Sequence, residues 1–252
     1  MGRLSPALAR VLLVLVLLAL WEIFTRLSSV SVILIAPPSA IIWQMVQILI
    51  RASNVPDFYA NAWLTIVEIL VAYGLAAVFG VLTGIAVASS KVIGDAFEPI
   101  LLVLYAVPKI ILYPVIVLMI GTGPATKIIF GIFVGIFVII FNTAAGLRQV
   151  EPNYLRLAHS LGYGGAKIFF KVELPAAAQT ILAGLRLGFG YTIIGVLTGE
   201  LLLVNAGLGY LIDWASVNYY TAQLYALIVI TLAIGVVANY VVGHLERRWV
   251  RG

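Results

Sequence analysis

The side chains that could carry chemistry in this chain are a few charged residues inside otherwise apolar stretches. Lys109 follows Pro108 within the apolar run 98–120, and Glu200 lies within the run 177–204. A charge inside a membrane span costs about 2.5 kcal/mol or more, so it requires a partner, a watery path or a position near the interface. Lys109 and Glu200 therefore either face a polar path or form a structural ion pair.

Other residue types restrict the chemistry further. Glu68 and Arg186 lie closer to the ends of their apolar runs, so we expect structural roles for both. Cysteine is absent, which excludes a disulfide framework, a thiolate metal site and a cysteine nucleophile. The two histidines, His159 and His244, are too few for a histidine metal cage. The sequence therefore predicts no metal site, and it lacks the polar cluster that an integral membrane enzyme requires.

A phosphate-binding loop is missing as well. The stretch Gly164-Gly165-Ala166-Lys167 lacks the upstream glycine and the following hydroxyl residue of a Walker A loop. We therefore expect that this chain binds neither ATP nor another cofactor.

Residues 148–175 interrupt the apolar pattern, and their spacing predicts a short amphipathic helix. Glu151-Pro152 is typical of a first helical turn, and Gly162 is typical of a helix stop. Between these points apolar residues recur at intervals of three, namely Leu155, Ala158 and Leu161. Such a helix outside the membrane indicates a docking element.

The composition places the rest of the chain in a membrane. Of the 252 residues, 63% are hydrophobic and 10% are charged, whereas a soluble domain has about 45–50% and 25%. The excess apolar surface must face lipid. The formal net charge of +5 comes from basic residues at the ends of apolar stretches and not from a basic face with aromatics, so a nucleic-acid partner is not expected.

Six apolar stretches reach, or nearly reach, the roughly 20 residues needed to cross a bilayer, which predicts an all-α polytopic membrane protein. They lie at 8–26, 62–88, 98–120, 128–147, 177–204 and 222–244. Ten Lys and Arg residues fall on the side that holds both termini and three on the other, which predicts cytoplasmic termini and a cytoplasmic 148–175 loop. The ten are Arg3, Arg10, Lys91, Arg148, Arg156, Lys167, Lys171, Arg247, Arg248 and Arg251, and the three are Arg26, Arg51 and Lys127.

Residues 1–57 are expected to hold an uncleaved first span and an interfacial helix. No small-residue cleavage site follows the first apolar run. Residues 41–50 are apolar on one face and too short to span, and Ser39 before them can cap a helix. Within the later spans, glycines four residues apart suit a tight bundle or a dimer seam, as at 80/84, 131/135, 184/188 and 195/199.

Residues 156–175 resemble the EAA loop of ATP-binding-cassette (ABC) importer permeases. Ala158 fits the third position of Glu-Ala-Ala, Gly162 fits the glycine, Val172 stands for the isoleucine, and Leu174-Pro175 fits the end, with the spacing fully kept. Arg156 and Leu157 replace the glutamate and the first alanine, which reverses the charge there. The resemblance identifies the predicted short helix as a coupling helix, formed by Arg156, Leu157, Ala158, His159, Ser160, Leu161, Gly162, Tyr163 and Gly164.

Further stretches make the chain similar to the nitrate, sulfonate and taurine branch of these permeases. They are Asn142–Arg148, Leu182–Arg186, Gly207–Ile212 and Leu245–Arg248. The resemblance implies the type I importer architecture, with residues 58–252 as the permease domain in the bacterial inner membrane. It also implies a second permease copy, two ATPase subunits that hold ATP and Mg, and a periplasmic or lipid-anchored substrate-binding protein.

In that branch, the middle of the third span and the acidic position of the fifth lie near the translocation path. The resemblance therefore implies that the path, for a small anionic solute, is lined or supported by Tyr105, Pro108, Lys109, Asn142 and Glu200. The competing interpretation makes Lys109 and Glu200 a structural pair without a substrate role. An ion-coupled secondary transporter remains the alternative function, although no clear inverted repeat is present.

Overall fold

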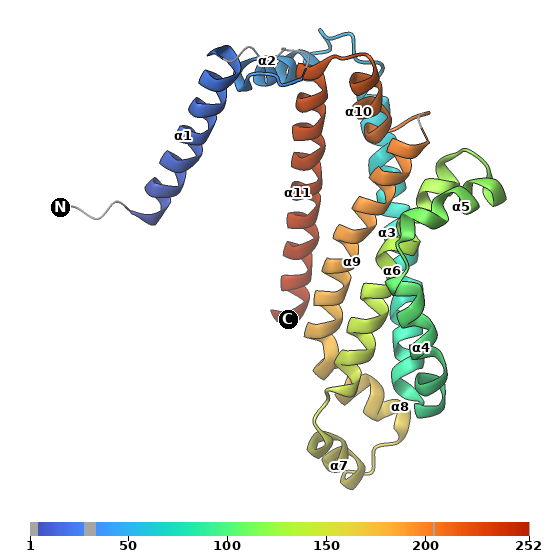
Figure 1. Ribbon diagram of the computed structural model, residues 1–252. Helices are drawn as coiled ribbons and strands as arrows, with labels where there is room; N and C mark the ends of the chain where they lie inside the picture. Colours follow the sequence, from blue (N-terminus) through green and yellow to red (C-terminus); the bar gives the residue numbers. More distant parts are fainter. Residues whose placement is uncertain (1–4, 28–33, 204, 252) are drawn as a thin grey trace.

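The computed structural model describes residues 5–27, 34–203 and 205–251, and the elements of this part are helices (Figure 1). Arg3 and Val204 lie outside the described residues, as do the side chains of Arg247, Arg248 and Arg251. The elements in chain order are α1 Pro6–Leu27, α2 Pro38–Leu49, α3 Phe58–Ser89, α4 Lys91–Ala106, η1 Lys109–Leu112, α5 Tyr113–Ile120, α6 Pro124–Arg148, α7 Pro152–Ser160, α8 Gly165–Ile168, η2 Phe169–Glu173, α9 Leu174–Leu202, α10 Leu208–Val217 and α11 Thr221–Arg251.

Five of these helical stretches are long and apolar enough to cross a membrane, and the pair α4 and η1–α5 counts as a sixth if it is one broken span. The six predicted spans are therefore present, but the third begins at Lys91 and the fifth at Gly165, both earlier than the sequence predicts. The third differs from a simple span, because its two halves meet at 89°.

Pro108 lies at the bend of this broken span. Val107 and Pro108 have extended backbone conformations, and α4 ends at Ala106 before the short η1 turn begins. Proline has no N–H for the helix ladder and disfavours helix in the residue before it. The predicted bend is thus present, as a full break instead of a kink.

The first half of the broken span, α4, is held by an arginine from the end of α6. Arg148 pairs with Glu98 of α4 at 2.7 Å and donates to the carbonyl of Val87, near the end of α3, at 3.2 Å. A Cβ at Gly94 would lie 2.9 Å from the backbone carbonyl oxygen of Val87, so only glycine lets α4 come this close to α3. Arg148 therefore ties α4 to both α3 and α6.

The centre of the bundle is α6, which packs along α3 on one side and α9 on the other. A Cβ added to Gly80 or Gly84 of α3 would lie within 3 Å of side chains of α6, and one added to Gly131 would lie 2.6 Å from Val196 of α9. Small residues permit such close approach of helices in lipid, where there is no hydrophobic force between them. Most of the predicted glycine pairs thus form seams within one chain.

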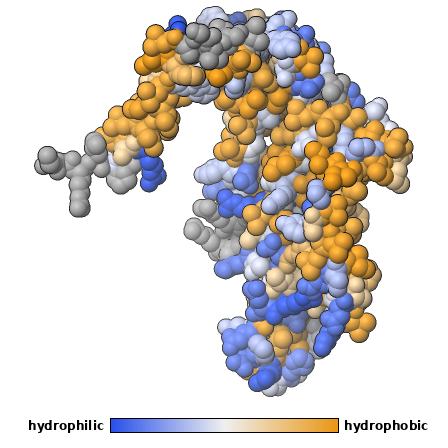
Figure 2. All heavy atoms as spheres, in the orientation of Figure 1, coloured by the Kyte–Doolittle hydropathy of each residue, from blue (hydrophilic) through white to orange (hydrophobic). Residues whose placement is uncertain are grey.

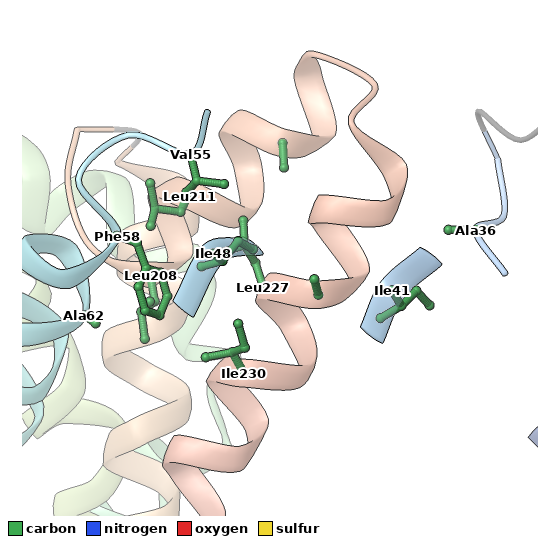
Figure 3. Close-up of a cluster of buried hydrophobic side chains, with 12 residues drawn as sticks. Ala36, Ile41, Ile48, Val55, Phe58, Ala62, Leu208, Leu211, Leu227 and Ile230 are labelled. Carbon is green, nitrogen blue, oxygen red and sulfur yellow. The ribbon is translucent and has the colours of Figure 1, made fainter. Parts of the chain in front are cut away.

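An apolar cluster lies at the end of the molecule formed by α2 and α10, opposite α7 (Figure 1). It joins α2, α10, α11 and the start of α3. Ile48 of α2, Leu211 of α10 and Leu227 of α11 are at most 1% exposed, and Figure 3 shows Ile48 between α10 and α11. The cluster fixes α2 against the bundle as a short helix that does not span, in agreement with the sequence prediction.

The first helix stands apart from the bundle and reaches it through α2 (Figure 1). Most of its apolar side chains are exposed within this chain, and Trp21 packs edge-on against Tyr225 of α11. Ser39 does not cap α2, because the N-cap position is Pro37. Instead the Ser39 hydroxyl donates to the Glu22 carboxylate at 2.7 Å, which fastens α1 to α2.

Figure 2 shows hydrophobic surface over α1 and over the broken span, and hydrophilic residues gathered at the end where α7 lies. The start of α1 and the end of α11 both point away from α2 (Figure 1). The polar end that carries α7 is therefore opposite the end formed by α2 and α10.

We predict that Gly84→Ala lowers the thermal stability of the protein, whereas Gly74→Ala in the same helix does not. A Cβ at position 84 would lie 2.6 Å from Thr143 Cβ and 2.8 Å from the Ile140 carbonyl oxygen, while nothing lies within 4 Å at position 74. Overpacking of this kind costs about 1–3 kcal/mol, equivalent to a Tm lower by about 2 °C or more. Thermal unfolding of the purified variants measures it, and equal Tm values for the two would contradict the close α3–α6 contact.

Candidate functional site

The predicted helix of the 148–175 loop is α7, and it ends as its sequence predicts. Pro152 is its first residue, and Gly162 has a φ of +74°, which glycine adopts without strain. The N–H of Gly162 donates to the carbonyl of His159 at 2.9 Å, and that of Tyr163 donates to the carbonyl of Ala158 at 3.1 Å. These two bonds form a Schellman motif, which stops the helix and satisfies its last carbonyls.

The buried face of α7 holds it against the rest of the protein. Ala158 is 4% exposed, and Leu155 packs on a cluster that includes Val150, Ala177 and Ile181. This cluster also contains Leu147 of α6 and Leu185 of α9, so a displacement of α7 would change the packing of both spans.

The opposite, outward face of α7 is apolar and uncovered in this chain. Tyr154, Leu157 and Leu161 are 55%, 60% and 64% exposed. The three residues of the apolar repeat are thus divided, because Ala158 and Leu155 pack inward whereas Leu161 is exposed with Leu157. Sequence alone did not single out Tyr154 for this face.

The remaining residues predicted for coupling surround this outward face. Arg156 is exposed, Ser160 donates to the Arg156 carbonyl, and His159 Nδ1 contacts the Leu155 carbonyl at 2.7 Å. Their side-chain bonds therefore stay within α7. Beyond it, Lys167 lies 3.7 Å from the centre of the half-buried Tyr163 ring, and Gly164 precedes α8.

The end of the loop runs into α9 through a π-helical turn, η2. Val172 lies in this turn, Leu174 begins α9, and Pro175 follows within its first turn. A π turn contains an extra residue relative to an α-helix and recurs at functional sites. The end of the loop and α9 thus form one continuous helical stretch from Gly165 to Leu202.

The break in the third span brings Lys109 and Tyr105 together. The Lys109 ammonium donates to the Tyr105 carbonyl at 2.8 Å and lies 4.6 Å from the centre of the Tyr105 ring. Phe137 of α6 lies 5.5 Å from the same ammonium, and Phe141 packs edge-on against Tyr105. Tyr105 is 38% exposed, and Lys109 is half-buried and has no carboxylate partner among the described residues. The ammonium group is therefore still available to an anion.

The other two residues predicted for the path lie differently. Asn142 donates to the Val138 carbonyl within α6 at 2.8 Å, and its side chain fills the space beside Gly184. Glu200 is 0% exposed, and its hydrogen-bond partners are Thr65 and Gly209. It does not pair with Lys109, so the structural ion pair between these two residues is not formed. The structure thus groups Tyr105, Pro108 and Lys109, whereas Asn142 contacts Val138 and Gly184, and Glu200 binds Thr65 and Gly209.

Glu200 belongs to a buried charged cluster that sequence reasoning missed. Glu68 of α3 and Lys127 of α6 are 1% and 0% exposed, and the Lys127 nitrogen lies 3.6 Å from a Glu68 oxygen. Lys127, which the sequence places among the basic residues on the side opposite the termini, is fully buried. The sequence signal that could have found the cluster is the set of two acids and one lysine, each within or beside an apolar span.

Comparison with known proteins gives a family match over most of the chain. Residues 76–251 match the family described as "Binding-protein-dependent transport system inner membrane component". The chain is 26% identical to a probable ABC transporter permease protein of Haemophilus influenzae, over 95% of each chain. It is 28% identical to the taurine transport system permease protein TauC of Escherichia coli, over 92% of this chain and 85% of that one.

Two further similarities are to a nitrate permease and to a solved structure. The nitrate import permease protein NrtB of Synechococcus elongatus is 29% identical over 70% of this chain and 72% of its own. A chain of the MetNI methionine ABC transporter, in an inward-facing conformation, superposes with a TM-score of 0.62 at 18% identity and covers 77% of this chain and 94% of its own. This last similarity shows a shared fold.

We predict that Gly207→Ala lowers thermal stability more than Gly121→Ala does. Both glycines have φ values that strain other residues, +103° and +91°, so each change carries a backbone cost of about 1 kcal/mol. A Cβ at Gly207 would also run into the Glu200 carboxylate, whereas none of the described atoms lies within 4 Å at Gly121. Thermal unfolding compares the two, and an equal loss of Tm would show that Glu200 does not fill the space beside Gly207.

Proposed function

Since the chain belongs to the family of binding-protein-dependent transport system inner membrane components, we propose that a homodimer of it forms the gated path of an importer for a small anion. The chain is a permease component of an ABC importer, in which ATP hydrolysis takes place in separate ATPase subunits. Such a system works with a substrate-binding protein and with those ATPases. An ion-coupled secondary transporter is not favoured, because the chain's family depends on a binding protein.

The family match carries the proposal, because it spans α7, the broken third span and the α6–α9 seam together. Residues 58–252 are the proposed permease domain, and residues 1–57 add the first span and the interfacial helix. We place both termini and α7 in the cytoplasm, where ten of the thirteen oriented Lys and Arg residues lie by sequence.

The proposed coupling element is α7, with Leu174 and Pro175 closing its loop. Its exposed apolar residues Tyr154, Leu157 and Leu161, here called the α7 knob, dock in a groove of the ATPase. Ala158, on the buried side, packs α7 against the permease. ATP and Mg bind in the ATPase pair, whose closure moves α7. Because α7 rests on the cluster with Leu147 and Leu185, this motion reaches α6 and α9, the two most tightly packed spans.

The proposed path passes the break of the third span, where Tyr105, Pro108 and Lys109 lie. An ammonium group over aromatic faces, without a carboxylate partner, suits a transient anion contact. Asn142 and Glu200 are left out of the proposed path, because Asn142 bonds within α6 and Glu200 binds Thr65 and Gly209. Relatives of the chain are named as permeases for taurine and for nitrate, so a sulfonate or an inorganic anion is the proposed substrate class.

Charge introduced on the α7 knob should uncouple transport without unfolding the protein. We expect Leu157→Asp and Leu161→Asp to lower ATP-driven uptake about tenfold or more, because an exposed apolar anchor at an interface carries much of its binding energy. Uptake into proteoliposomes and co-purification of the ATPase measure the effect. Ala166→Asp, which adds the same charge to an exposed residue of α8, is the control and should leave both unchanged. Uptake that survives both leucine substitutions would refute the coupling role.

Removal of the Lys109 charge tests the path. We expect Lys109→Met to lower anion uptake, while Lys109→Arg retains most of it because the positive charge is kept. Both variants should assemble normally, since Lys109 makes no ion pair among the described residues. Unchanged uptake by an assembled Lys109→Met transporter would contradict the path assignment.

A further inference from the structure

Three charged side chains are buried together where α3, α6 and α9 meet the start of α10. Glu68, Lys127 and Glu200 are each at most 1% exposed. If both carboxyl groups were ionised, the cluster would hold two negative charges against one positive charge. Neither coupling through α7 nor the path at Lys109 uses these residues.

Glu200 has the surroundings of an ionised carboxylate. One of its oxygens accepts the Thr65 hydroxyl at 2.6 Å and the other accepts the Gly209 N–H at 2.8 Å. The Thr65 hydroxyl has one hydrogen to give, and Glu200 at 2.6 Å is a closer acceptor for it than the Asn61 carbonyl at 3.1 Å. The Thr65 oxygen in turn accepts the Leu208 N–H at 2.8 Å. An ionised carboxylate only accepts hydrogen bonds, and here both oxygens do so.

Glu68 has no such donors. Neither of its oxygens has a hydrogen-bond partner among the described residues, although both oxygens are fully buried. Its contact with Lys127 is 3.6 Å, too long for a hydrogen bond, and Lys127 instead donates to the Ala206 carbonyl at 2.7 Å. The nearby Tyr113 hydroxyl donates to the Gly199 carbonyl at 2.7 Å. The Glu200 carboxyl group lies on the same side of α3 as Glu68, because it binds Thr65, which is three residues earlier in that helix.

A proton on Glu68 resolves both the charge and the missing bond. An uncompensated buried charge costs several kcal/mol, and two adjacent buried carboxyl groups avoid this cost when they share one proton. We propose that Glu68, Glu200 and Lys127 form a buried proton-binding site in which Glu68 carries the proton and donates to ionised Glu200, whose charge Lys127 balances. The cluster is then electrically neutral.

This site holds the turn between α9 and α10. Lys127 binds the carbonyl of Ala206, Asn61 accepts the N–H of Gly207 at 2.7 Å, Thr65 accepts that of Leu208, and Glu200 accepts that of Gly209. Four consecutive residues are thus fixed to α3, α6 and α9. The proton-binding site positions this turn, and the inference does not depend on the transport mechanism.

Infrared spectroscopy of the intact transporter at neutral pH tests the proton directly. A protonated carboxyl group has a C=O stretching band that a carboxylate lacks. We expect this band in the wild type, its loss in Glu68→Gln, and its retention in the control Glu98→Gln, which removes a half-exposed carboxylate paired with Arg148. A spectrum of Glu68→Gln that lacks no carboxyl band relative to the wild type would overturn the proposal.

Thermal unfolding of the same preparations tests which carboxyl group holds the proton. Glutamine resembles a protonated glutamate, so Glu68→Gln should change Tm by about 2 °C or less. Glu200→Gln leaves Lys127 without a balancing charge, and Tm should fall by about 6 °C or more. A fall for Glu68→Gln as large as that for Glu200→Gln, or a failure of Glu68→Gln to fold, would overturn the assignment to Glu68.

Discussion

The close approach of α6 to α3 and α9 is the contact on which the rest of this protein depends. Glycines 84 and 131 lie where any Cβ would meet a neighbouring helix at 2.6 Å. In lipid the packing of helices relies on such van der Waals contact and on hydrogen bonds between helices. With α6 fixed between its neighbours, the elements at its two ends acquire fixed positions as well.

Both ends of α6 carry polar anchors. At one end Lys127 enters the buried charged cluster, and at the other Arg148 binds Glu98 and the Val87 carbonyl before α7 begins. A rigid α6 therefore connects the turn between α9 and α10 with the loop that bears α7. The broken third span packs against the same helix, because Tyr105 and Lys109 contact Phe137, and Tyr105 also contacts Phe141.

Sequence patterns predicted what depends on local chemistry. Apolar length located the spans, and Gly162 located the end of α7, because a left-handed turn favours glycine. The patterns failed where the partner is distant along the chain: Glu68 and Lys127 are far apart in sequence, and nothing local distinguishes their buried pairing from two charges near an interface. Pro108 predicted a bend, but the angle of 89° depends on how α5 packs beside α6.

The π-helical turn η2 gives the spacing of the 148–175 loop a further meaning. A π turn inserts one extra residue, and one residue rotates a helix by about 100°. The nine residues between Gly162 and Val172 therefore include part of this turn, whose extra residue sets the rotation of α9 about its axis and so the side of α9 that faces α6. Deleting a residue there would shorten the loop slightly, but its main effect would be to turn the glycine seam of α9 away from α6.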